Sequence, residues 1–248
     1  MRPTDEFSDY KAVEHRFFLL YCGPFVLKDF LTDKAYNHFM LLHAACRMLS
    51  SPNVMTFATI AKSYLELYVE QAPDVYKPEF VNLNVHYLNH LVDDLMYAKS
   101  NLENISAFPF ETELGKIKNF LLSPHRILAQ YCRRLHEERE IINKVAQLPK
   151  DLEIKKVKKV MNNKIVQILE FVQIDDEVCL SVVDYSRKRS VYEFPCESSM
   201  LNTYEIIDQV TDSTKRPIKL DDIQFKLVKL MIGCEKSEQK TFVLPLLH

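Results

Sequence analysis

Glycine is scarce in this chain: only three of its 248 residues are glycine, and they stand singly at Gly23, Gly115 and Gly233. A loop that cradles phosphate needs several glycines close together, because the backbone must approach the phosphate oxygens. This scarcity excludes the usual glycine-rich nucleotide-binding loops, and we expect no nucleotide cofactor. The formal net charge of −2 also gives no global basic field of the kind that attracts nucleic acid.

Paired cysteines and long apolar runs are missing as well. The six cysteines are spread singly, without a Cys-x-x-Cys pair, at positions 22, 46, 132, 179, 196 and 234. In a chain of this length they indicate reduced cysteines and not a disulfide framework. No apolar run approaches the roughly 20 residues of a membrane helix, and Met1–Glu6 does not resemble a signal peptide. We therefore expect a soluble protein of the nucleus or cytoplasm, with no membrane partner.

The first half of the chain repeats the spacing of amphipathic helices, with apolar residues three or four positions apart. The apolar stripes cover residues 13–21, 35–49, 57–68, 85–95, 114–121 and 128–142. The start of the last helix is predicted most sharply, because Ser123 is a good N-cap residue and Pro124 suits the first helical position. Together these stripes predict a helical bundle.

The character of the sequence changes near Leu148, where a lysine-rich stretch leads into short β-rich runs. The predicted strands cover residues 164–174, 178–184, 191–194, 204–210, 225–232 and 241–247. Short strands at this spacing favour an antiparallel meander that closes into a small barrel or sandwich. We therefore predict an α+β protein, with a helical domain over residues 1–148 and a β-rich domain over residues 149–248.

Two histidines on the fourth predicted helix form the first candidate site. His86 and His90 stand one turn apart, and Asp93 or Asp94 one turn further on could complete a metal-binding triad. The alternative is that these polar residues only hydrogen-bond neighbouring helices. The His-Glu-x-x-His signature of zinc proteases is missing, so the spacing alone leaves both interpretations open.

A second pair with zinc-ligand chemistry is His43 with Cys46, near His38. Cys46 falls on an apolar helical stripe, and no second pair of cysteines is present to complete a zinc site. Free cysteine is among the most buried residue types. Packing in the core is therefore the favoured interpretation of this pair.

Glu111 is the third candidate, because it follows Phe108-Pro109-Phe110 at the point where a helix is predicted to begin. Aromatic neighbours can exclude water from a metal-binding or proton-transferring carboxylate, although an acid is also ordinary at a helix N-terminus. From Lys116 to Arg134 there are five basic residues and no acidic one, namely Lys116, Lys118, Arg126, Arg133 and Arg134. A basic surface beside an acid suits phosphodiester binding. The alternative is a solvated helix face.

Several blocks of the sequence, taken in order, resemble the C-terminal region of CACTA-type (En/Spm-type) DNA transposases, particularly their animal copies. The central blocks are FVNLNVHYLNHLVDDL at residues 80–95 and SAFPFETELGKIK at residues 106–118. They are similar to the family's His-x-x-x-His-Leu helix and to its (Tyr/Phe)-Pro-Phe-Glu motif followed by Leu-x-x-(Leu/Ile)-Lys. KAVEHRFFLLYCGPFVLK at residues 11–28, YEFPCESS at 192–199 and VLPLLH at 243–248 extend the likeness over nearly the whole chain.

This resemblance implies descent from a cut-and-paste transposase with an RNase H-like core, of which the helical half would be the C-terminal part. In that core an Asp-Asp-Glu triad holds two Mg²⁺ ions for in-line phosphodiester transfer. By the resemblance Glu111 is the third acid, and Lys118 matches a Glu–Lys spacing of some such transposases. The chain departs from the family because the two aspartates would lie upstream of Met1. It also has Asn101–Asn104 in place of a glycine-containing loop, and it is shortened between residues 148 and 157.

One acid cannot hold two metal ions, so we expect no transposition chemistry and no bound cofactor in this chain alone. The leading hypothesis is a transposon-derived fragment that is catalytically silent and retains contacts with DNA or with a protein partner. One alternative is a metal-dependent nuclease or hydrolase that uses Glu111, or else His86, His90 and Asp94. Another is a scaffold module that docks a protein partner through its β-rich tail.

Overall fold

A computed structural model of the chain describes residues 9–146, 157–160, 164–174, 177–185, 187–207, 215–219, 222–232 and 240–247. The chain divides into two compact units, one of residues 1–105 and 153–248 and the other of residues 106–152. The first unit contains both helices and strands, and the described residues of the second form two helices. The domains predicted from sequence, residues 1–148 and 149–248, concern independent folding and stay a prediction.

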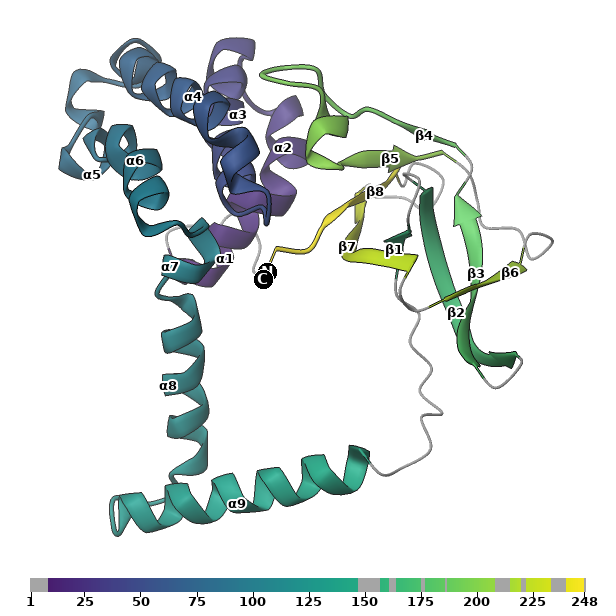
Figure 1. Cartoon of the computed structure of the whole chain (residues 1–248). Coiled ribbons are helices and arrows are strands. Elements are labelled where there is room, and N and C mark those ends of the chain that lie inside the picture. The colour runs from purple at the N-terminus through teal and green to yellow at the C-terminus, as the bar shows by residue number, and fades with distance from the viewer. Residues whose placement is uncertain are drawn as a thin grey trace. The chain divides into compact units, whose positions relative to one another are not determined.

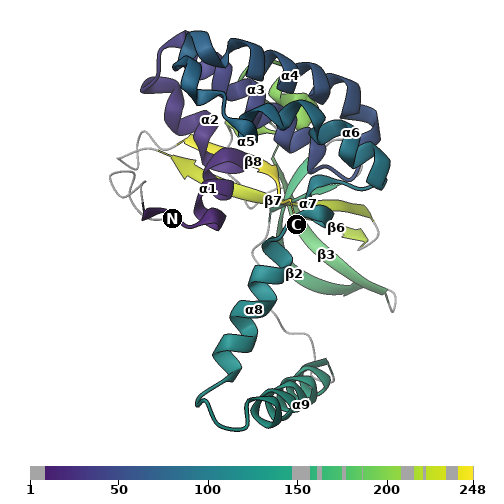
Figure 2. The same cartoon turned by 90° about the vertical axis from the view of Figure 1, so that its left-hand side faces the viewer.

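Helices form the first part of the larger unit (Figure 1). They are α1 (Ala12–Phe17), α2 (Gly23–Val26), α3 (Asp33–Leu49), α4 (Val54–Val75), α5 (Leu83–His86), α6 (Leu88–Ala98) and α7 (Leu102–Ile105), with the short turns η2 (Phe18–Cys22), η3 (Leu27–Asp29) and η4 (Pro78–Phe80). Thr32 begins α3, because its hydroxyl accepts a hydrogen bond from the Ala35 N–H at 3.4 Å. In Figure 2, α3, α4 and α6 lie beside one another. Leu49, Leu65 and Leu95 are buried in the core that these helices share.

The strands of the same unit pair in antiparallel fashion wherever their residues are described. They are β1 (Val157–Val160), β2 (Lys164–Ile174), β3 (Glu177–Tyr185), β4 (Lys188–Arg189), β5 (Tyr204–Ile206), β6 (Lys215–Lys219), β7 (Ile223–Ile232) and β8 (Lys240–Pro245), with the turn η5 (Ser198–Leu201) before β5. Their order is β4-β5-β8-β7-β1-β2-β3-β6. The start of β7 pairs with β1 and the rest of β7 pairs with β8. Because the described order has two ends, β4 and β6, the predicted closure into a barrel is not confirmed.

A shared core joins the helices of this unit to its strands. The ring of Phe25 lies 4.2 Å from that of Phe242, measured between centroids. The hydroxyl of Tyr21 accepts a hydrogen bond from the Leu247 N–H at 2.9 Å, and Cys196 lies in the core of the helices. The predicted α+β class is confirmed, with helices in the N-terminal part and antiparallel strands in the C-terminal part.

One predicted strand is wrong, because residues 191–194 are irregular. The Val191 N–H donates to the Ser198 hydroxyl at 2.8 Å, and the Tyr192 carbonyl accepts from the Ser198 N–H at 2.9 Å. These polar groups are therefore satisfied inside a local loop and not by a neighbouring strand.

The smaller unit holds α8 (Phe108–Phe120) and α9 (Ile127–Ala146). The helix predicted to start at Pro124 starts at Ile127 instead, because Arg126 has a left-handed backbone with φ 50°. The Gln130 side chain holds the turn before it, accepting from the Leu122 N–H at 3.0 Å and donating to the Ser123 carbonyl at 3.1 Å. In the part of the chain that the structure describes, no helix has the length and apolar character needed to span a bilayer.

Candidate functional site

Glu111 lies in the first turn of α8, and Lys118 lies in its last turn. The Glu111 N–H donates to the Ala107 carbonyl at 3.0 Å, which fixes the acid at the start of the helix. Its side chain is exposed, and the neighbouring Phe110 is 72% exposed. The aromatic neighbours on α8 therefore build no water-excluding wall around this carboxylate.

Three of the five candidate basic residues form ion pairs with acids on their own helix. Lys116 binds Glu113 at 2.6 Å. Arg133 and Arg134 bind Glu137 at 3.1 and 2.7 Å, and these arginines, Arg134 first, lower the pKa of Glu137. The surface of α9 is thus mixed in charge beyond the stretch that appears purely basic in the sequence.

The other two basic residues, Lys118 and Arg126, form no ion pair within the described part of the chain. Both side chains are exposed. Lys118 shares α8 with Lys116, whereas Arg126 stands in the turn that precedes α9. The second unit therefore carries basic side chains on both helices and in the turn between them.

His86 and His90 stand on two helices and not on one, because α5 ends at His86 and α6 begins at Leu88. Their rings are 5.4 Å apart between centroids and nearly perpendicular. Lys62 holds Asp93, with its ammonium 2.8 Å from each carboxylate oxygen. Over the described ranges, no three His, Cys, Asp or Glu side chains, those of His86, His90 and Asp94 included, are grouped so as to hold a metal ion.

His43 and His38 are core residues, each 1% exposed. The His43 ring bonds the Leu19 carbonyl through Nδ1 at 2.7 Å and the Tyr192 hydroxyl through Nε2 at 3.2 Å. Because a carbonyl only accepts, Nδ1 carries the proton and Nε2 accepts from the hydroxyl. Both ring nitrogens of His43 are thus occupied. Burial raises the pKa of the Cys46 thiol to about 12, so these residues have the character of core packing.

Arg47 is a buried cation that the motif search missed. It is 3% exposed, and its guanidinium donates to the Leu20 carbonyl at 2.9 Å and to the Pro245 carbonyl at 3.3 Å. Its carbon Cζ also lies 5.6 Å from the centre of the Tyr21 ring. Burial lowers the pKa of Arg47, opposed by nearby Tyr192 and Tyr21. Within the part of the chain that the structure describes, no carboxylate forms an ion pair with Arg47.

One signal in the sequence could have pointed to this residue. Arg47 is the only Lys, Arg, Asp or Glu between positions 35 and 61, inside a strongly apolar pair of helices. A lone charge in such a run is seldom left in the core without a specific partner.

Comparison with known proteins adds little about activity. Residues 139–246 match the family described as a domain of unknown function (DUF8592). This range takes in the end of α9 and most of the β-rich part of the chain. No curated protein and no solved structure matches the chain significantly.

Proposed function

We propose that the chain is a transposon-derived protein that performs no phosphodiester chemistry and binds duplex DNA through the basic residues of α8, α9 and their connecting turn. The observation that supports this best is that the SAFPFETELGKIK block lies almost wholly on one helix, with Glu111 and Lys118 two turns apart. The proposal also assigns the helical part to the C-terminal region of an RNase H-like core and the strands to a barrel or sandwich. It implies a nuclear protein.

Binding is favoured over chemistry by the surroundings of Glu111. Two-metal catalysis needs several carboxylates that converge on ions roughly 4 Å apart. The neighbouring acid on α8, Glu113, already pairs with Lys116 at 2.6 Å. An exposed single carboxylate at a helix start is suited to stabilising the helix.

The arginines of α9 can exchange Glu137 for a phosphate at low cost. The Arg133 side chain is 82% exposed and that of Glu137 is 39% exposed, and exposed ion pairs contribute only about 0–1 kcal/mol. Arginine binds phosphate through paired N–H groups. DNA can therefore recruit these side chains without leaving a buried charge behind.

We expect Arg133→Ala with Arg134→Ala to weaken binding to a fluorescein-labelled duplex about tenfold at low salt, because two phosphate contacts are lost. The slope of log K against log salt should also become shallower by about 2, since each contact contributes roughly 0.9. Fluorescence anisotropy of the full chain between 50 and 200 mM salt measures both quantities.

The matched control is Lys28→Ala with Lys77→Ala, which removes the same charge from exposed positions of the larger unit. An equal loss of DNA affinity in this control would mean that the arginine variant weakens binding only through its change in net charge. No binding of the unaltered chain at 50 mM salt would sink the DNA proposal, and saturable capture of a protein partner would then favour the scaffold alternative.

The metal-dependent alternative predicts one bound ion per chain, and our proposal predicts none. Elemental analysis of the purified full chain after dialysis against Zn²⁺ and then buffer decides between them. We expect less than about 0.1 zinc per chain, because two histidines without a third ligand hold zinc weakly. A full equivalent that disappears in His86→Ala with His90→Ala would restore the alternative.

A further inference from the structure

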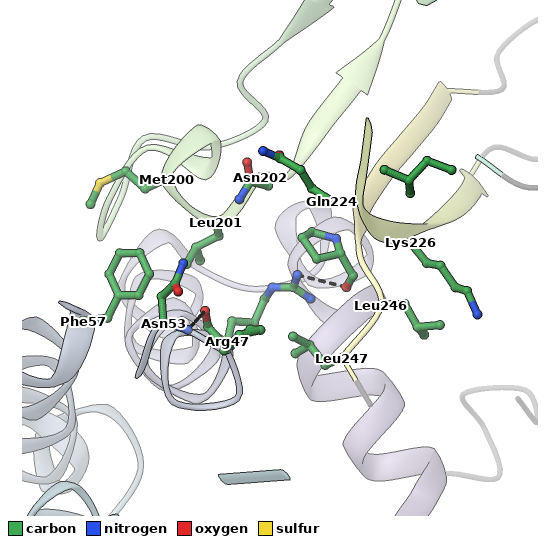
Figure 3. Close-up of a pocket in the computed structure, with 14 residues that line it drawn as sticks. Arg47, Asn53, Phe57, Met200, Leu201, Asn202, Gln224, Lys226, Leu246 and Leu247 are labelled. Atoms are coloured by element: carbon green, nitrogen blue, oxygen red, sulfur yellow. Dashed lines mark hydrogen bonds between the residues drawn. The ribbon is translucent and has the colours of Figure 1, made fainter. Parts of the chain in front are cut away.

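A cavity of about 510 Å³ lies within the larger unit, beside Arg47 (Figure 3). Its walls come from the turn between α3 and α4, from η5, from the start of β7 and from the segment that follows β8. Phe57, Leu201 and Leu247 are among its apolar walls. A volume of this size falls within the range of about 300–1,000 Å³ that is typical of small-molecule sites.

The charged residues that line this cavity are both basic. They are Arg47 and Lys226, and the described lining includes no aspartate or glutamate. Uncharged donors accompany them, since the amides of Asn53 and Gln224 also line the cavity. Such a wall attracts an anion and offers no repulsive group against it.

Arg47 lines this cavity, and its guanidinium has hydrogen-bonding capacity to spare. A guanidinium carries five N–H donors, and carbonyls occupy one on Nη1 and one on Nη2. The Nε donor is buried and without a partner in the described structure. A buried cation with unused donors is costly, so an anion that reached the guanidinium would be stabilised by its charge and by hydrogen bonds.

We propose that the cavity binds a small organic anion, with a carboxylate or phosphate head on Arg47 and an apolar body against Phe57, Leu201 and Leu247. Both heads present two oxygens to a guanidinium fork, which arginine binds through paired N–H groups. Access is available because Met200 and Leu246, two of the lining residues, are 43% and 38% exposed. Lys226 is exposed on the same wall and adds a second attractive charge.

Titration calorimetry and thermal shift on the full chain test this with four probes: decanoate, decyl phosphate, decanol and inorganic phosphate. We expect saturable one-to-one binding of at least one tailed anion, and decanol to bind at least about tenfold more weakly because it lacks charge. The tighter of the two tailed anions identifies the head. Equal binding of decanol, or no saturable binding of either tailed anion, would overturn the proposal.

Variants on β7 provide a matched pair. Lys226→Glu places a repulsive charge on the cavity wall and should weaken binding of the tailed anion about tenfold. Lys229→Glu makes the same change three residues along, at an exposed position that does not line the cavity, and should leave binding within about twofold. Equal effects of the two variants, or none from Lys226→Glu, would contradict the site.

A variant of Arg47 then tests the head group directly. Arg47→Lys keeps the charge and loses the planar fork, so we expect about tenfold weaker binding with the native circular dichroism spectrum. Unchanged binding by a folded Arg47→Lys chain would show that Arg47 has only a structural role, as the donor to the Leu20 and Pro245 carbonyls. Where this variant does not fold, the probe series and the β7 pair still decide the outcome.

Discussion

Gly23→Ala should destabilise the chain by about 1–3 kcal/mol, because a Cβ atom at this position has no room. It would lie 2.5 Å from Cζ of Phe39 and 2.8 Å from the carbonyl oxygen of Phe18. The ring can shift, but the Phe18 oxygen belongs to the backbone of the same turn. Chemical unfolding in urea measures the free energy of unfolding, and a lower midpoint with an unchanged slope is the expected result.

Gly115→Ala is the matched control for this substitution. A Cβ at position 115, within α8, meets no atom within 4 Å. Replacing a helical glycine with alanine stabilises a helix by roughly 0.5–1 kcal/mol, so the two substitutions should have opposite signs. A Gly23→Ala chain as stable as the unaltered protein would mean that α2 and α3 do not approach as described.

The stability of the protein should fall steeply in mild acid, because His43 is folded in its neutral form. Burial, followed by the charge of Arg47, lowers the pKa of His43 from 6.5 to about 3. Between these two values the unfolded chain binds a proton that the folded chain does not. This stabilisation is therefore complete above about pH 6.5 and is lost as the pH falls, at about 1.4 kcal/mol per pH unit.

Urea unfolding at pH 7, 6, 5 and 4.5 measures this slope, and burial lowers the pKa of His38 in the same direction. The His43→Gln chain should be less stable at pH 7, because the two ring nitrogens of His43 bond the Leu19 carbonyl and the Tyr192 hydroxyl, and a glutamine side chain does not match that geometry. The free energy of unfolding of this variant should also change less with pH, by the contribution of one proton, or about 1.4 kcal/mol per pH unit. His136→Gln is the control for the loss of a histidine, since the His136 side chain is 75% exposed and not part of the core.

Apolar spacing predicted α3, α4 and α6 well because their apolar residues are buried, whereas α8 and α9 bury none of their described residues. The stripe at residues 35–49 corresponds to α3, and Leu49 in it is fully buried. The start of α9 was predicted wrongly, because a serine followed by proline satisfies the local rule while Gln130 stabilises a different turn. Strand β6 (Lys215–Lys219) escaped prediction because it carries a single buried residue, Ile218, among exposed ones.

The candidate sites also differ in how far the sequence could predict them. Glu111 and Lys118 could be placed on one helix from sequence, since their order along α8 is local. The surroundings of Arg47 could not, because the Leu20 and Pro245 carbonyls reach it from distant parts of the chain, and Lys226 of β7 lines the same cavity. Residue spacing reports neighbours on one helix or strand, whereas a cavity is assembled by the fold.

The hydrogen bond between Tyr21 and Leu247 joins residues 226 positions apart. It cannot form until nearly the whole chain has been synthesised. A ribosome that adds about 5–20 residues per second needs roughly 10–45 s to deliver the second residue after the first. Throughout that interval the apolar side of η2 that Leu244 and Leu247 later cover is open to other nascent chains. Until these last residues have emerged, the apolar side chains of η2 lack the partners that cover them in the folded protein.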